Sequence, residues 1–268
     1  MTATATTLAA PAVTAGRPNA VTDALTIAWR NLLNIRRNPQ LLVFATIQPV
    51  IFVLMFRYVF GGAISTPGIP YVDYLMPGIF VQTVVFGALT TGVGLAEDLQ
   101  KGLIERFRSL PMARSAVLLG RTIADLVRNI FVVALMVVVG LLVGWNPGAD
   151  LVSVVAGLGM VLGFAYALSW VFAIVGLSVR DSETAQAASF PILAPLVFAS
   201  SAFVPVASMP GWLQAFARHQ PVSVVVNATR ALTLDGASAS QVLSAAAWIV
   251  GIVAVFAPLA VARYRRAV

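Results

Sequence analysis

Cysteine is absent from this chain of 268 residues, and histidine and lysine occur once each. Without cysteine the chain can form no disulfide and no thiolate metal site, and a single histidine, His219, excludes metal sites built from several histidines. The only lysine, Lys101, follows Gln100 and precedes Gly102, so the GxxxxGK[ST] loop that cradles nucleotide phosphates is absent too. We therefore expect no catalytic residue, no metal site and no cofactor bound by this chain, which does not have the composition of an enzyme.

Charged residues are also scarce. They make up 10% of the chain and apolar residues 59%, whereas soluble domains have about 25% charged residues. So much apolar surface cannot be hidden in a water-soluble globule of this size, and the composition predicts a multi-pass protein of the cell (plasma) membrane, with membrane lipids as its surroundings. Residues 1–20 lack the basic start and apolar core of a secretory signal. We expect them to form a disordered cytoplasmic tail before a single transmembrane domain, residues 21–268.

Long uncharged runs predict an all-α membrane protein with six transmembrane helices. The expected spans are residues 41–60, 77–96, 122–143, a part of 151–179, 185–203 and 240–262. Between the last two, residues 204–240 include Pro210, Trp212, Pro221 and Arg230. Its apolar run, residues 222–234, is too short and too interrupted to span, so the stretch predicts an external re-entrant segment or helices that lie on the surface.

The basic residues are distributed unevenly along these runs. Six spans put both termini on one side, and that side receives most of the 17 Lys and Arg residues, whereas the other side receives only Arg218 and Arg230. The positive-inside rule therefore predicts cytoplasmic termini. The net charge of +7 then reflects topology, and we do not expect nucleic acid as a partner. Arg57, near the end of the first span, is expected to extend to the interface; a contact with substrate is the alternative.

Residues 21–38, before the first span, have the pattern of an amphipathic helix. Apolar residues recur at helical spacing, and the other faces are polar: Val21, Leu25, Trp29, Leu32 and Leu33 against Arg30, Asn34 and Arg37. This pattern predicts an interfacial helix, with Trp29 in the headgroup layer and the arginines, including Arg36, toward anionic lipid. The alternative is a cytoplasmic extension of the first span.

The most densely charged stretch, residues 97–121, lies between two apolar runs. Glu97, Lys101 and Glu105 form two i,i+4 pairs, and a second face carries Leu99, Leu103, Phe107 and Leu110. Pro111 is expected to end this helix because it lacks an N–H. A short amphipathic helix that projects from the bilayer could be contacted by a soluble partner; an ordinary solvated loop is the alternative.

Arg121, Asp125 and Arg128 share one helical face at the expected start of the third span. We expect Asp125 to neutralise its basic neighbours in a structural clasp. A proton relay is the alternative, but a relay would need further acidic residues deep in the spans, where the sequence has none.

Together these features resemble the permeases of type-2 ABC exporters of the actinobacterial daunorubicin-resistance kind. The resemblance is carried by the interfacial helix, by Gly102, Glu105, Pro111 and Gly120-Arg121 in the central stretch, by the six spans with internal termini, and by Met209–Leu213, His219–Ser223 and Arg230. It implies a dimer of permeases, identical or related, each bound to a separate ABC ATPase subunit that carries ATP and magnesium. It also implies a coupling helix, in or beside which lie Glu97, Lys101, Gly102, Glu105, Arg106, Phe107 and Pro111.

The resemblance predicts ATP-driven export of hydrophobic or amphipathic drugs. Export of a cell-envelope lipid or glycolipid by the same architecture is the first alternative. A membrane-embedded enzyme is disfavoured by the lack of Cys, His and acidic clusters, and a non-transporting anchor would not need two tight polar loops and a re-entrant segment.

Overall fold

A computed structural model describes residues 20–37, 39–64, 66, 68–102, 114–234 and 236–267. Within these ranges the chain is helical and has no strand, which confirms the predicted all-α fold. The elements are α1 (Ala20–Arg37), α2 (Pro39–Leu54), the π-helix η1 (Met55–Phe60), α3 (Tyr71–Gln100), α5 (Arg114–Leu142), α6 (Leu151–Gly176), α7 (Ser182–Phe198), the 3-10 helix η2 (Val206–Ser208), α8 (Gly211–His219), α9 (Pro221–Thr233) and α10 (Ala239–Ala267).

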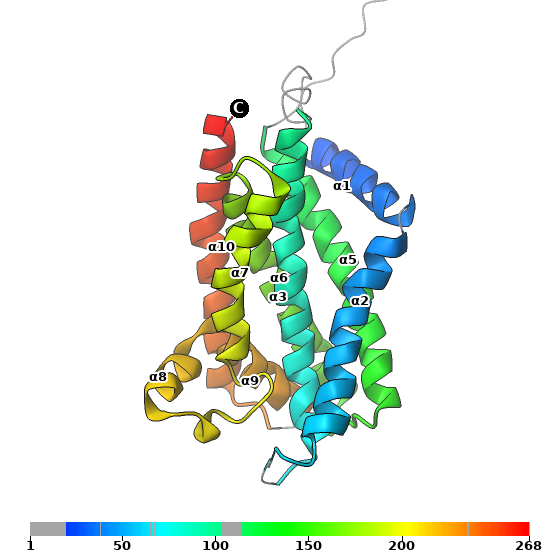
Figure 1. The fold of residues 1–268 in the computed structure, drawn as a ribbon, viewed down its shortest axis with the longest axis vertical. Helices are drawn as coiled ribbons and strands as arrows, with labels where there is room; N and C mark the ends of the chain where they lie inside the picture. The colour runs from blue at the N-terminus through cyan, green and yellow to red at the C-terminus, as the bar shows by residue number, and fades with distance from the viewer. Residues whose placement is uncertain are drawn as a thin grey trace, which may run out of the picture.

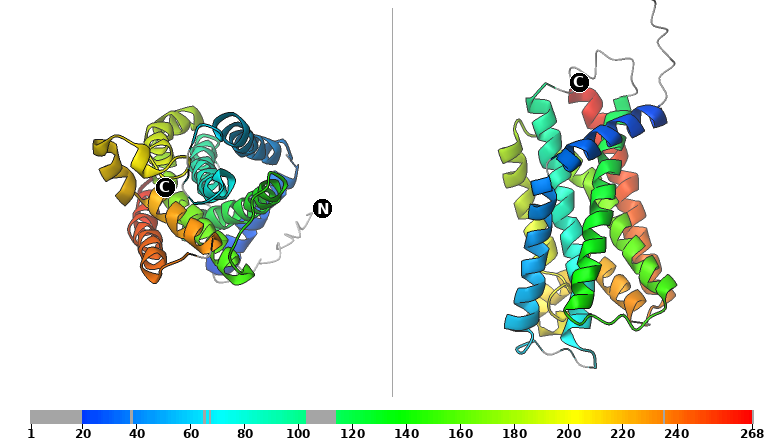
Figure 2. Two further views of the ribbon diagram at one scale, coloured as in Figure 1. Left: turned by 90° about the horizontal axis from the view of Figure 1, so that it is seen from below. Right: turned by 90° about the vertical axis from the view of Figure 1, so that its right-hand side faces the viewer.

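Helices α2, α3, α5, α6, α7 and α10 run along the long axis of the molecule, with α3 and α6 near its centre (Figures 1 and 2). Helix α1 lies across one end, where the C-terminus, the end of α3 and the start of α5 are also found. Helices α8 and α9 lie at the opposite end. We refer to these two ends as the α1 end and the α9 end.

In the described part of the chain, four helices are long and apolar enough to cross a membrane: Tyr71–Gln100, Ala116–Leu142, Leu151–Gly176 and Ala239–Arg266. They coincide with the second, third, fourth and sixth expected spans. The region of the first expected span is also helical, but its apolar helix, Ala45–Phe60, is shorter. The fifth expected span is helical only as far as Phe198, where the 17 residues of α7 end. The third span was expected to start near Thr122, whereas α5 is already helical at Arg114. Charged residues at a helix end do not stop the helix. The expected start, placed after the last charged residue before Thr122, was therefore too late for α5.

The half of α3 nearest the α9 end is the centre of the core. Every residue from Tyr71 to Val85 is buried, because α2, α6, α7 and α9 all pack around this helix. Two glycines allow α3 and α6 to approach closely: a Cβ on Gly92 would lie 2.5 Å from the carbonyl oxygen of Phe172, and one on Gly176 would lie 2.2 Å from that of Gly92. Small residues at such crossings are typical of membrane helices, whose association depends on close packing.

Helix α1 has two distinct apolar faces. Ala24, Ile27 and Ala28 are buried, and α1 packs on α5 at Gly120, where a Cβ would lie 2.5 Å from the carbonyl oxygen of Ala24. The neighbouring stripe, Val21, Leu25 and Trp29, is exposed. Because α1 lies across the end of α2 rather than continuing it (Figure 1), it is a separate element and not an extension of the first expected span.

Aspartate side chains cap two of the helices. Asp150 accepts hydrogen bonds from the N–H groups of Val152 at 3.0 Å and Ser153 at 3.3 Å at the start of α6. Asp181 accepts one from the N–H of Thr184 at 2.7 Å at the start of α7, and this bond lowers the pKa of its carboxyl. The short polar loops between helices thus also define where the next helix begins.

Candidate functional site

The end of α3 contains the first of the expected ion pairs. Lys101 Nζ lies 2.5 Å from Glu97 Oε1, and its hydrogen bond to this carboxylate raises the pKa of Lys101. Beyond it the helix stops, because Gly102 has a φ of 64° and its N–H donates to the carbonyl of Leu99 at 3.0 Å. The prediction of one amphipathic helix running through residues 97–110 is therefore wrong: Glu97 lies in the last turn of α3, and Lys101 is the C-cap of this helix. Glu105, Arg106, Phe107 and Pro111 lie outside the described residues.

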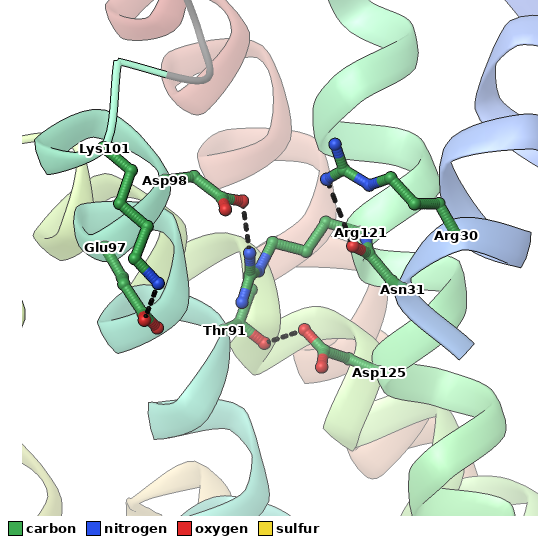
Figure 3. A network of polar contacts seen from close by, with 8 residues as sticks. All are labelled: Arg30, Asn31, Thr91, Glu97, Asp98, Lys101, Arg121 and Asp125. Carbon is green, nitrogen blue, oxygen red and sulfur yellow. Dashed lines mark hydrogen bonds and ion pairs between the residues drawn. The ribbon is translucent and has the colours of Figure 1, made fainter. Parts of the chain in front are cut away.

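A second ion pair joins α3 to α5. Arg121 Nη1 lies 2.7 Å from Asp98 Oδ2, and both side chains are only 18% exposed (Figure 3). The guanidinium passes over Gly94, where a Cβ would lie 1.7 Å from Arg121 Nη2, so a side chain at position 94 would displace it. Sequence reasoning missed Asp98, because helical spacing compares residues within one helix and these partners are 23 positions apart.

Further from the α1 end, Asp125 and Arg128 extend the contacts between α3 and α5. Thr91 Oγ1 donates to Asp125 Oδ2 at 2.6 Å, and Arg128 Nη2 lies 3.8 Å from Asp125 Oδ1. Arg128 also donates to the carbonyl of Gly87 at 2.7 Å and to the Thr90 hydroxyl. Asp125 thus faces Arg128 as expected, whereas Arg121 is paired with Asp98 instead.

We call Asp98, Arg121, Thr91, Asp125 and Arg128 the α3–α5 network. Since α5 is helical from Arg114, its three members on α5 lie about two to four turns inside the helix and not at its mouth. The network joins the two helices that lead into and out of residues 103–113. A displacement of that segment would therefore act on α3 and α5 together.

The other residues expected to be functional before the first span lie on α1. Arg30 donates to its neighbour Asn31 at 3.3 Å on α1 (Figure 3). Trp29 and Arg37 are exposed, and the side chain of Arg36 is outside the described set.

At the α9 end a second polar cluster surrounds Arg230. Its guanidinium donates to the carbonyl of Tyr74 at 3.0 Å, to that of Ser201 at 2.8 Å and to Asn227 Oδ1 at 2.9 Å. It also lies over the Tyr74 ring, 3.6 Å from the ring centroid. Ser201 is further held by the Tyr74 hydroxyl at 3.0 Å and by Ser223 Oγ, which accepts its N–H at 3.0 Å.

This Arg230 cluster fixes the linker of residues 199–205, between α7 and η2, onto α3 and α9. The Tyr71 hydroxyl adds a bond to the carbonyl of Phe203 at 3.0 Å. Of the other expected residues in this region, Pro221 opens α9, Pro210 precedes α8 and Trp212 is exposed on α8. The arrangement is structural, and the described part of the chain has no group of His, Cys, Asp and Glu residues that could hold a metal.

Comparison with known proteins decides the family. The profile of the ABC-2 type transporter family matches residues 22–234. The chain belongs to this family. The daunorubicin resistance ABC transporter permease protein of Streptomyces coeruleorubidus is 36% identical over 249 residues, which cover 93% of this chain and 88% of that protein.

More distant relatives cover most of the chain as well. A probable doxorubicin resistance ABC transporter permease protein of Mycobacterium tuberculosis is 27% identical over 83% of this chain and 81% of its own length. A putative transport permease of Pyropia yezoensis is 26% identical over 76% of this chain and 71% of its own length. The predicted resemblance is confirmed: the chain is the membrane subunit of an ABC exporter, a transport subunit in a family whose ATPase is a separate chain.

Proposed function

We propose that this permease exports hydrophobic or amphipathic drugs from the cell, driven by an ABC ATPase subunit that binds at the α1 end and carries ATP and magnesium. The observation that carries the proposal is the α3–α5 network, which ties together the two helices flanking residues 103–113. The similarity to permeases named for daunorubicin and doxorubicin resistance supports a drug as cargo.

The distribution of charge supports a cytoplasmic α1 end and six spans. Helix α2 and η1 together run from Pro39 to Phe60, which corresponds to about 33 Å of helix and is enough to cross the hydrocarbon core. Basic residues gather at the α1 end, at Lys101, at Arg180 and at the end of α10, whereas Arg57, Arg218 and Arg230 lie at the α9 end. This asymmetry follows the positive-inside rule and makes α8 and α9 the external segment.

The ATPase would contact the central stretch and α1. Glu97, Lys101 and Gly102 close α3, and Glu105, Arg106, Phe107 and Pro111 follow them directly in sequence. The exposed stripe of α1, Val21, Leu25 and Trp29, is available to lipid headgroups. A second permease copy, identical or related, would complete the transporter.

The proposal is tested with the permease co-expressed with its ATPase. Reversal of charge at Glu105 and Arg106 is expected to abolish drug efflux while membrane insertion persists, and unchanged efflux would contradict docking at this stretch. The purified permease alone is expected to hydrolyse no ATP. A strain lacking the permease is expected to accumulate a fluorescent drug; a changed envelope lipid profile with normal drug accumulation would favour lipid export instead.

A further inference from the structure

Five phenylalanine rings meet at the α9 end between α2–η1 on one side and α7 with the linker on the other. Phe52, Phe56 and Phe60 recur every four residues on α2–η1; Phe198 ends α7 and Phe203 belongs to the linker. The rings of Phe56 and Phe203 are stacked, with centroids 4.5 Å apart and planes at 8°. Phe52 and Phe198 lie 5.8 and 6.0 Å from Phe203, which is buried among them.

The two sides of this aromatic contact are held very differently. The linker is bonded to α3 and α9 through Tyr71, Tyr74, Ser223 and Arg230. Between described residues, no hydrogen bond or ion pair joins residues 45–60 to any other helix. One side is therefore fixed by directional bonds, while the other rests on apolar packing alone.

The backbone of the second side is also unusual. Residues 55–60 form a π-helical turn, a geometry that occurs mostly in single turns and often at functional sites. Directly after it, a Cβ on Gly61 would lie 2.3 Å from the carbonyl oxygen of Arg57, so the turn requires glycine there. A wide turn of this kind can change register within a helix, and the apolar contacts beside it can separate without leaving a buried hydrogen-bonding group unsatisfied.

We propose that the Phe56–Phe203 ring pair is the exit gate of the permease, and that α2–η1 is the part that moves away when cargo leaves. The proposal rests on the proposed function, because an exporter must open this end to release cargo. The linker is the fixed side of the gate, and the Arg230 cluster holds Phe203 in place. On opening, the two ring faces are exposed to the departing cargo.

Because the chain has no cysteine, introduced thiols can be labelled selectively. Spin labels on Tyr58→Cys and Asn146→Cys measure the distance from η1 to the turn between α5 and α6. This turn is bonded to α3, because the backbone N–H of Asn146 donates to Asp73. Labels on Asn146→Cys and Trp212→Cys form a reference pair that does not include α2–η1. All three side chains are exposed, so labels should be tolerated. In the complex with its ATPase, trapping with ATP and vanadate is expected to lengthen the first distance and leave the second unchanged. An unchanged first distance in a complex that transports would overturn the gate.

Cross-linking tests the same gate by activity. The variant with Phe56→Cys and Phe203→Cys, joined by a short reducible bis-methanethiosulfonate, is expected to lose drug efflux and to regain it on reduction. The matched pair, Gln214→Cys and Arg218→Cys, lies on α8 outside the Arg230 cluster, where the two side chains are hydrogen-bonded at 2.8 Å, and it is expected to transport equally with and without the link. Efflux that persists across the linked gate would refute the proposal. If the complex with the unmodified permease shows no drug efflux, the proposed function is contradicted instead. The spin-label distances would then still show whether the gate opens.

Discussion

Arg230 joins three segments at the α9 end, and its replacement tests whether this end is fixed as strongly as its contacts indicate. The guanidinium makes three hydrogen bonds, to two backbone carbonyls and one side-chain amide, and stacks on Tyr74. A hydrogen bond to a charged group contributes about 1.5–3 kcal/mol. The sum of three would overstate the loss in Arg230→Ala, because the acceptors keep other donors: Ser201 O retains the Tyr74 hydroxyl, and Asn227 Oδ1 retains Ser201 Oγ.

Because each acceptor keeps another donor, each lost hydrogen bond is expected to lower the free energy of unfolding by roughly 1 kcal/mol. The lost contact with the Tyr74 ring is expected to lower it by about 1 kcal/mol more. The relief of removing a partly buried charge offsets some of this loss, so we expect Arg230→Ala to destabilise the permease by about 2–4 kcal/mol. At about 2–4 °C per kcal/mol for a chain of this size, Tm should fall by roughly 5–15 °C. Arg230→Lys should lose about half as much, since an ammonium group lacks the planar fork that reaches several acceptors at once.

Thermal unfolding of the purified permease, followed by tryptophan fluorescence, measures these shifts. Arg218→Ala is the matched control: this exposed arginine makes one bond, to Gln214 at 2.8 Å, and should change stability by no more than about 0.5 kcal/mol. The double variant Tyr74→Phe with Arg230→Ala removes both side-chain donors to the buried Ser201 carbonyl. It should therefore cost about 1–3 kcal/mol more than the sum of the single variants. A Tm for Arg230→Ala equal to that of Arg218→Ala, or strict additivity in the double variant, would refute the argument.

Three further predictions concern α3. Asp98→Asn should lower the Tm and reduce efflux, because it leaves the partly buried Arg121 without its counter-charge. Exchange of the two residues, Asp98→Arg with Arg121→Asp, should restore part of the Tm and part of the efflux. A normal Tm and normal efflux in Asp98→Asn would contradict the role of the pair. Gly92→Ala should destabilise the chain by about 1–3 kcal/mol through overpacking against α6, whereas Gly159→Ala, which meets no atom within 4 Å, should be nearly neutral in the same assay. Lys101→Met should leave the Tm nearly unchanged, since its ion pair with Glu97 is exposed to solvent. A large fall in Tm would contradict this expectation.

The sequence allowed the helical class and the family to be predicted because both depend on local pattern. Uncharged runs predict membrane helices, and loose motifs in a fixed order predict a family. Helix ends were harder to place. Lys101 lies in a charged stretch that continues the helical spacing, so nothing in that spacing predicts the stop at Gly102, where a left-handed backbone ends α3. In the same way Arg121 looked like the start of a span, although α5 already runs through it.

Pairs between helices could not be predicted from spacing at all. Asp98 and Arg121 lie on different helices, and their contact depends on how α3 and α5 cross, with Gly94 leaving room for the guanidinium. Arg230 was singled out from its sequence motif, but its acceptors on Tyr74 and Ser201 are 156 and 29 residues away along the chain. Tertiary packing decides such contacts, and a single sequence contains no direct record of it.

The continuity of α3 has a mechanical consequence. Tyr74, in the Arg230 cluster, and Asp98, in the α3–α5 network, belong to one unbroken helix and are separated by about 36 Å at 1.5 Å per residue. A helix that is bonded to its neighbours at both ends acts as a strut: a push along its axis at one end arrives at the other with little compression. An ATPase that moves the end of α3 would therefore move the linker and Phe203 as one body with α3, relative to α2–η1, without a relay of side-chain rearrangements between them.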